Sequence, residues 1–200
     1  MKKITLALAA FALAGGLVAQ ENRFSLGVEL AVPVGDLGKA YSFGIGGTAG
    51  LELPFGDHIG VLVQAGYISF MGKDITAYGV TVKNDARGMI PIQGGLKYYF
   101  SDNQEGFYAG LLAGVHMSTV KVAYYDPSTL SLQSKTETNT NFSLAPLVGF
   151  IIGENLDIAL RYQLIFAKEP EYNASTGAIE DKTVSNSYLG VRLAYMFGGR

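Results

Sequence analysis

The segment Leu189-Gly-Val-Arg-Leu-Ala-Tyr-Met-Phe197 is the clearest indicator of the fold. Every second residue in it is large and apolar, and the residues between are Gly190, Arg192, Ala194 and Met196. A repeat of two residues indicates a β-strand, because successive side chains of a strand point to opposite faces. We therefore expect a strand here with one continuous apolar face and one face of mainly small or charged residues.

The same alternation occurs seven more times along the chain. The further segments are 24–32, 43–53, 59–67, 90–100, 107–117, 142–152 and 156–166. Most are as long as the 9–11 residues that a tilted strand needs to cross a bilayer. The pattern predicts eight strands of membrane-spanning length.

The links between these segments alternate strictly between short and long. The short links are 54–58, 101–106 and 153–155, and the long ones are 33–42, 71–87, 119–141 and 167–186. Tight periplasmic turns alternating with longer external loops are typical of outer-membrane barrels. Pro91 and Pro146 lie inside strand patterns, and we interpret both as bulges near the external rim, since proline cannot donate to a ladder.

The composition of the two faces indicates which one contacts lipid. One face of every segment is apolar and uncharged, whereas the other is mostly Gly, Ala, Gln and Ser with a few charges: Glu29, Glu52, Lys97, Arg161 and Arg192. Small residues suit the inside of a narrow barrel. An apolar band around all eight strands would not be tolerated in water but is required in lipid. The sequence thus predicts an all-β fold, an eight-stranded antiparallel up-and-down transmembrane β-barrel.

Residues 1–19 have the features of a secretory signal peptide. Lys2 and Lys3 precede an apolar run over residues 4–18, and Ala19 ends a cleavage-site pattern. The run is too short to span a bilayer as a helix. We expect cleavage after Ala19 and a barrel over residues 20–200, located in the outer membrane.

The composition excludes several other functions. Charged residues make up 16% of the chain, against about 25% in an ordinary soluble protein. A net charge of −2 gives no sign of nucleic-acid binding. The absence of cysteine excludes disulfides and thiol catalysis. Two separated histidines predict no metal site, and no motif predicts a cofactor.

The chain resembles the porin-family outer membrane protein β-barrel domain, the small eight-stranded barrels of the OmpA and OmpX type. The resemblance covers residues 20–197 and rests on these stretches: Val32-Pro-Val-Gly-Asp-Leu-Gly38, Ile90-Pro-Ile-Gln-Gly-Gly-Leu-Lys-Tyr-Tyr-Phe100, Phe107-Tyr-Ala-Gly-Leu-Leu-Ala-Gly114, Leu156-Asp-Ile-Ala-Leu-Arg-Tyr162 and the terminal segment quoted first. It implies contact with outer-membrane lipid and lipopolysaccharide. It also implies that the barrel-assembly machinery reads the aromatic end of the last strand, here Phe197. The family shares no catalytic motif, so the resemblance implies no activity.

Three charged residues form the main candidate site. Glu29, Arg161 and Arg192 belong to the first, seventh and eighth strands, which are consecutive around a closed barrel. Because buried charges are costly unless they are paired, we expect an ion cluster that plugs the lumen. The alternative for these residues is a selectivity filter or gate in a narrow pore.

We expect a structural or surface-contact role for this barrel. Two alternatives are a lipid-modifying enzyme and a soluble carrier. His116 and Ser118 share the inner face near the external rim, which would suit a lipid-modifying acyl hydrolase or acyltransferase. No GxSxG elbow or orienting acid accompanies them, so we expect a hydrogen bond at the rim and no enzyme. A soluble lipocalin-like carrier would have to turn its apolar face inward. Loops 71–87, 119–141 and 167–186 are candidates for contact with an external ligand.

Overall fold

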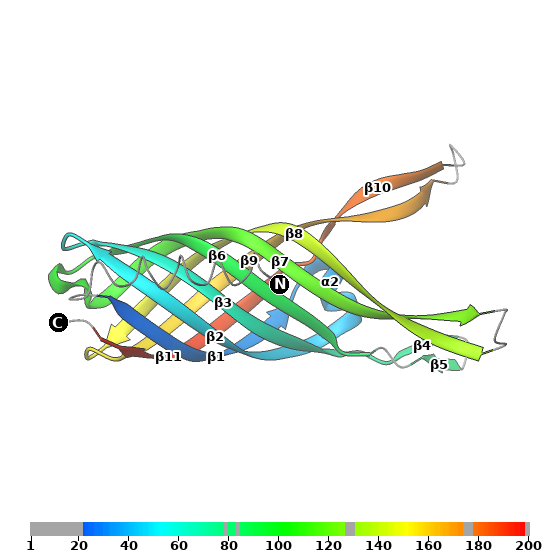
Figure 1. Ribbon diagram of the computed structural model, residues 1–200, viewed down its shortest axis with the longest axis horizontal. Helices are drawn as coiled ribbons and strands as arrows, with labels where there is room; N and C mark the ends of the chain where they lie inside the picture. The colour runs from blue at the N-terminus through cyan, green and yellow to red at the C-terminus, as the bar shows by residue number, and fades with distance from the viewer. Residues whose placement is uncertain (1–21, 78–79, 83–84, 127–130, 174–177, 199–200) are drawn as a thin grey trace, which may run out of the picture.

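The computed structural model describes residues 22–77, 80–82, 85–126, 131–173 and 178–198; the signal peptide expected at residues 1–19 lies outside them. Eight long strands form a closed barrel (Figure 1). They are β1 (Arg23–Pro33), β2 (Tyr41–Phe55), β3 (Ile59–Gly72), β6 (Arg87–Tyr99), β7 (Gly106–Asp126), β8 (Ser131–Ile152), β9 (Leu156–Asn173) and β11 (Tyr188–Phe197). Each pairs antiparallel with the next, and β11 closes the barrel on β1. The predicted fold is confirmed.

The two faces of the wall have the predicted orientation. Along β11, buried and exposed residues alternate without a break. On the other strands, too, most large apolar side chains point out of the barrel and are exposed. Examples are Leu26, Val63, Leu111 and Phe150. Polar and charged side chains lie buried inside the barrel, among them Gln64, Gln93, Glu52 and Lys97. Within the described residues, no helix is long and apolar enough to cross a membrane.

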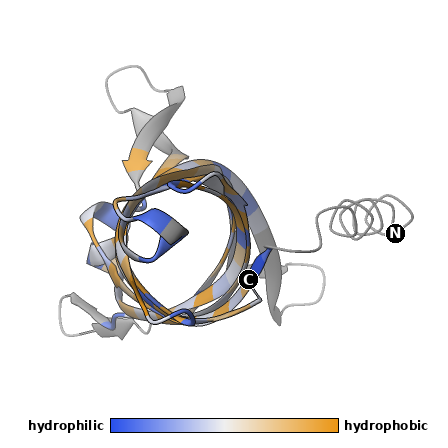
Figure 2. Cartoon of the chain, turned by 90° about the vertical axis from the view of Figure 1, so that its left-hand side faces the viewer, coloured by the Kyte–Doolittle hydropathy of each residue, from blue (hydrophilic) through white to orange (hydrophobic). Residues whose placement is uncertain are grey.

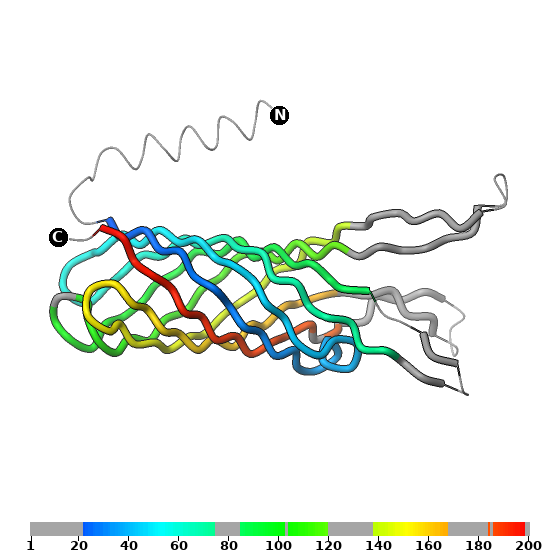
Figure 3. The backbone as a smooth tube through the Cα atoms, turned by 90° about the horizontal axis from the view of Figure 1, so that it is seen from below, coloured from blue at the N-terminus to red at the C-terminus, as the bar shows by residue number. Residues whose placement is uncertain are grey.

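The two ends of the barrel differ (Figures 1 and 3). At the end where β1 begins and β11 ends, which we name the turn end, short turns join β2 to β3 and β8 to β9, with Gly56 and Gly153 at φ values of 66° and 58°. The third turn holds the short helix η1 (Asp102–Gln104). The opposite hairpin end carries α2 (Gly35–Ala40), the hairpin of β4 (Ile75–Ala77) and β5 (Val80–Val82), and the outer parts of β7, β8 and β9 with β10 (Ala178–Ser185).

Two of the predicted long loops are largely strand. β7 and β8 stay paired without a register shift from Gly106 and Ile151 out to Asp126 and Ser131. β10 continues the ladder on β9 from Phe166 to Asn173. The polar composition suggested loops, but residues 119–141 are rich in Thr, Val and Tyr, which favour strands. Residues 167–173 and 178–185 pair as strands despite a largely polar composition. The loop interpretation of 119–141 and 167–186 was therefore wrong in its secondary structure.

The bulges predicted at Pro91 and Pro146 are absent. The register of β3 with β6 is the same on both sides of Pro91, and that of β8 with β9 is the same on both sides of Pro146. Each proline instead leaves a gap in one ladder while its strand pairs continuously with β7. In a strand, the N–H and C=O of one residue point to the same neighbour, so a missing N–H interrupts one ladder only. The register shift in this wall lies between Tyr41 and Phe43 in β2.

Candidate functional site

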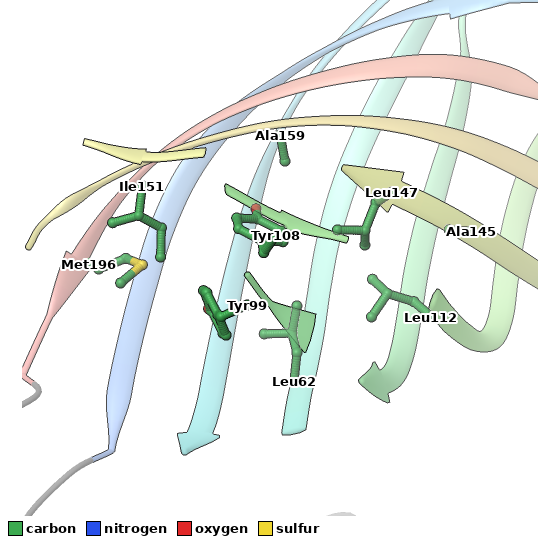
Figure 4. Packing of buried hydrophobic residues seen from close by; sticks show 9 residues of the cluster. All are labelled: Leu62, Tyr99, Tyr108, Leu112, Ala145, Leu147, Ile151, Ala159 and Met196. Carbon is green, nitrogen blue, oxygen red and sulfur yellow. The ribbon is translucent and has the colours of Figure 1, made fainter. Parts of the chain in front are cut away.

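The turn-end half of the lumen is packed by a cluster of buried apolar and aromatic residues (Figure 4). Its members are Leu62, Tyr99, Tyr108, Leu112, Ala145, Leu147, Ile151, Ala159 and Met196. Tyr99 and Tyr108 are direct partners in the β6–β7 ladder, and their rings lie 5.4 Å apart. These two tyrosines are fully buried. They therefore fill the interior, whereas most aromatic residues of the strands face outward.

A chain of ion pairs crosses the lumen beside this cluster. The ammonium of Lys97 lies 2.8 Å from Glu52 Oε2 and 3.4 Å from Asp157 Oδ2. The guanidinium of Arg192 lies 3.0 Å from the same Asp157 oxygen. All four side chains are at least 96% buried. Because buried charges are stable only when paired and hydrogen-bonded, this network holds β2, β6, β9 and β11 in one arrangement.

Hydroxyl groups complete the network. The Tyr108 hydroxyl donates to Asp157 Oδ1 at 2.5 Å, and the Tyr99 hydroxyl donates to Glu52 Oε1. Arg192 donates through Nε to Thr48 Oγ1 and through Nη2 to Ser25 Oγ, each at 2.8 Å. The carboxylates and the Arg192 guanidinium thus have partners on several strands, as buried polar groups require.

Glu29 and Arg161 form a second buried ion pair, through Glu29 Oε2 and Arg161 Nη2. The structure therefore brings two of the three predicted site residues into contact. Arg192 is the direct backbone partner of Glu29 in the β1–β11 ladder, but its guanidinium turns toward Asp157 instead. The predicted trio is split between two linked groups of charges.

Lumen glycines make room for both glutamates. A Cβ atom at Gly190 would lie 2.6 Å from Glu29 Oε1, and one at Gly60 would lie 2.6 Å from Glu52 Oε1. No real side chain tolerates such an approach without displacement of the carboxylate. Gly190 and Gly60 are therefore required by the packing of the two glutamates, whereas a Cβ at Gly95 or Gly114 would meet the backbone of a neighbouring strand.

A neutral polar layer lies farther toward the hairpin end. His116 Nδ1 is 2.9 Å from Ser143 Oγ, and His116 Nε2 is 3.3 Å from the Tyr188 hydroxyl. Gln93 donates to the same Ser143 oxygen at 3.1 Å. His116, Ser143 and Ser118 are all buried. The hydrogen bond expected of His116 is therefore present, but inside the lumen.

A second apolar cluster closes the hairpin end. It comprises Ala31, Leu37, Tyr41, Ile68, Phe70, Met89, Ile165 and Tyr188. Leu37 belongs to α2, which overlaps the ring of strands when the barrel is viewed along its axis (Figure 2). Backbone bonds from Val34 to Ser187 and from Lys73 to Ala40 hold both ends of α2. The lumen is thus capped by apolar side chains at both ends.

Sequence reasoning assigned no role to Asp157, Tyr99 and Tyr108. The alternating pattern places all three residues on the inner face, so their orientation could be predicted from the sequence. Their mutual contacts depend on the offset between neighbouring strands, which the sequence does not contain. Among the described residues, no group of three or more His, Cys, Asp or Glu side chains could hold a metal ion.

A closed eight-stranded barrel with an apolar outer band and a polar, plugged interior defines an integral membrane barrel of the outer-membrane type. A family model supports this class independently: the outer membrane protein beta-barrel domain matches residues 4–197. The chain belongs to this family, and its location is the outer membrane.

Solved structures with the same fold include three small outer-membrane barrels. The N-terminal β-barrel domain of Pseudomonas aeruginosa OprF has a TM-score of 0.53 and 11% identity, covering 89% of this chain and 98% of that one. Pseudomonas aeruginosa OprG has a TM-score of 0.52 and 15% identity, covering 90% and 97%. Ail, the attachment invasion locus protein of Yersinia pestis, has a TM-score of 0.51 and 12% identity, covering 89% and 99%. No curated protein matches the sequence. These likenesses show the fold alone.

Proposed function

We propose that the protein is a non-enzymatic outer-membrane barrel with a structural or surface-contact role, exported by a signal peptide that is cleaved after Ala19. The observation that carries this proposal is the contrast between the lumen and the hairpin end. Apolar side chains fill the lumen at both ends, while β7 with β8 and β9 with β10 extend beyond it (Figure 1). The surfaces available to bind a partner are therefore on the strand extensions, and the lumen offers no channel.

The closed lumen argues against a pore. Leu37, Phe70 and Tyr188 pack together at the hairpin end, and Tyr99 and Tyr108 pack near the turn end. The interior of an eight-stranded barrel is only wide enough for side chains to fill. Passage of a solute would require both clusters to unpack.

The position of the histidine argues against a lipid-modifying enzyme. Acyl transfer needs a nucleophile that the lipid can reach and a base that a third group orients. Ser143 and His116 have no exposed surface. The second nitrogen of His116 contacts the Tyr188 hydroxyl and not a carboxylate. This set is better explained as packing of the lumen.

The partners proposed for this protein follow from its two exposed regions. The apolar outer band contacts outer-membrane lipid, and the assembly machinery reads the end of β11 at Phe197. The extensions formed by β4 to β5, β7 to β8 and β9 to β10 face lipopolysaccharide or an external ligand. Among the described strands, β10 pairs with β9 alone, so its outer edge is available to pair with a strand of a partner.

Epitope accessibility on whole cells tests this proposal. A short epitope placed in 127–130, between β7 and β8, should be labelled by antibody on intact cells. The matched epitope in the turn 153–155 should be labelled only after the outer membrane is permeabilised. The reverse pattern, or labelling of neither epitope in an outer-membrane fraction that contains the protein, would contradict the proposal. Mass spectrometry of the mature N-terminus tests cleavage after Ala19.

A further inference from the structure

A pocket lies at the hairpin end of the wall, where β3, β6 and β7 are neighbours (Figure 1). We name it the rim pocket. It has a volume of about 410 Å³, and the described residues that line it are Tyr67, Asp85, Ala86, Gly88 and Thr119. Small-molecule sites occupy about 300–1,000 Å³, so the rim pocket is large enough for a ligand.

The rim pocket is on the outer face of the barrel. Tyr67 of β3 points outward and is exposed. Gly88 of β6 and Thr119 of β7 are direct partners in the ladder, and the residues next to them, Met89 and Ser118, are buried. Because successive side chains of a strand point to opposite faces, Gly88 and Thr119 face outward as well. A molecule in the surrounding membrane can therefore reach this pocket.

The rim pocket marks the edge of the apolar outer band. One step closer to the turn end, the outward positions of β6 and β7 are Ile90 and Met117. One step beyond the pocket, the outward position of β3 is Ser69, and the exposed Asp85 lies at the pocket itself. The boundary between apolar and polar surface is the level at which lipid headgroups lie.

Glycine at position 88 makes room for the ring of Tyr67. A Cβ atom at Gly88 would lie 2.8 Å from the Tyr67 hydroxyl and 3.1 Å from its Cε2. The ring therefore lies over Gly88, and it remains 54% exposed. The face of an aromatic ring carries partial negative charge and attracts the C–H groups of a sugar ring. Tyr67 thus offers a stacking surface for a sugar.

The polar groups of the rim pocket match the same ligand. The Asp85 carboxylate accepts hydrogen bonds, and the Thr119 hydroxyl both donates and accepts them, as sugar hydroxyls require. The described lining residues include no Lys, Arg or His. A phosphate here would therefore meet the charge of Asp85 without a compensating cation from the lining. The lining favours a neutral sugar ring over an anionic group.

We propose that the rim pocket binds one sugar ring in the headgroup of a glycolipid, lipopolysaccharide. The ring stacks on Tyr67, its hydroxyls bond to Asp85 and Thr119, and the acyl chains lie along the apolar band below. This inference rests on the proposed function, in which the hairpin end faces lipopolysaccharide, and adds the place and the chemistry of that contact.

A tryptophan reporter tests the inference. The chain contains no tryptophan, so the Tyr67→Trp variant carries a single indole, in the rim pocket. The refolded barrel, residues 20–200, would be inserted into phosphatidylcholine vesicles with and without lipopolysaccharide. Lipopolysaccharide should shift the indole emission to shorter wavelength, because a stacked sugar excludes water from the ring. Phosphatidylglycerol at equal negative charge should leave the emission unchanged.

Two matched controls accompany this variant. Phe142 is an outward aromatic residue of β8, 52% exposed and outside the rim pocket, so Phe142→Trp should respond equally to the two lipids. In the Tyr67→Trp background, Asp85→Ala should raise the lipopolysaccharide fraction at half of the shift about tenfold, the effect of losing one hydrogen bond to a charged group. Asp74→Ala, at an exposed aspartate that does not line the pocket, should leave this fraction unchanged.

Several outcomes would overturn the inference: no shift in Tyr67→Trp, an equal shift with phosphatidylglycerol, an equal lipopolysaccharide-specific shift in Phe142→Trp, or no effect of Asp85→Ala. The same shift with free glucosamine would overturn the lipid-linked source of the sugar. Both leaflets of the vesicles contain lipopolysaccharide, so the result does not depend on which way the barrel inserts. Failure here would therefore leave the epitope labelling, and with it the proposed function, unaffected.

Discussion

At the scale of single residues, the lumen is held by charges that have partners on other strands. Glu29 on β1 meets Arg161 on β9, two strands away around the barrel. Asp157 on β9 meets Arg192 on β11 and Lys97 on β6. Such pairs contribute specificity of arrangement more than net stability, and removal of one partner leaves a charge that nothing compensates.

Replacement of Glu29 by alanine should be strongly destabilising. It leaves the Arg161 guanidinium buried without its counter-charge, which costs about 3–5 kcal/mol of unfolding free energy. The double variant Glu29→Gln with Arg161→Gln should lose less, because no unpaired charge remains. Urea unfolding in detergent micelles measures both, with Glu154→Ala in an exposed turn as the control. A single variant as stable as the double variant would show that the pair is not what stabilises this region.

Adjacent glycines in β6 should respond in opposite ways to alanine. A Cβ at Gly95 would meet the backbone of Leu111 and Leu112, whereas a Cβ at Gly94 has its nearest neighbour at 3.7 Å. Overpacking of the interior by Gly95→Ala should cost about 1–3 kcal/mol, and Gly94→Ala on the outer face should be nearly neutral. Unfolding midpoints compare the two variants. Similar losses at both sites would mean that the two faces of β6 are wrongly assigned.

At the scale of strands, alternation predicted which residues face lipid, and the prolines did not disturb it. Buried and exposed positions alternate through Pro146, from Ser143 to Ile152. The error was to treat a missing donor as a change of register. A proline removes a hydrogen bond from one ladder but adds no residue, so the faces on both sides of it remain in phase.

An arginine on the outer band should impair insertion. Leu111 points outward from β7 and is 53% exposed, so an arginine there must enter the hydrocarbon. Leu111→Arg should lower the unfolding free energy in lipid vesicles by about 2–4 kcal/mol. Gln133→Arg, in the part of β8 that extends beyond the barrel, should have no effect. Equal folding yields for the two variants would indicate that this band does not face lipid.

At the scale of the whole molecule, the sequence was sufficient for the barrel and insufficient for its interior. Periodicity and link lengths predicted eight strands and their order. The inward position of Arg192 was predictable in the same way, but its contact with Asp157 was not. That contact depends on strand offset and on side-chain torsions, which no local pattern determines. The link 33–42 was predicted only as a long connection, so neither α2 nor the cap that Leu37 forms was predicted.

Planar-bilayer recording of the refolded barrel, residues 20–200, tests whether the lumen is closed at both ends. Apolar clusters fill both ends of the lumen, and the ion network crosses it between the strands. The membrane should therefore remain at its baseline conductance after insertion, with insertion verified by protease protection in vesicles of the same lipid. Reproducible single-channel steps in the wild-type protein would contradict this account.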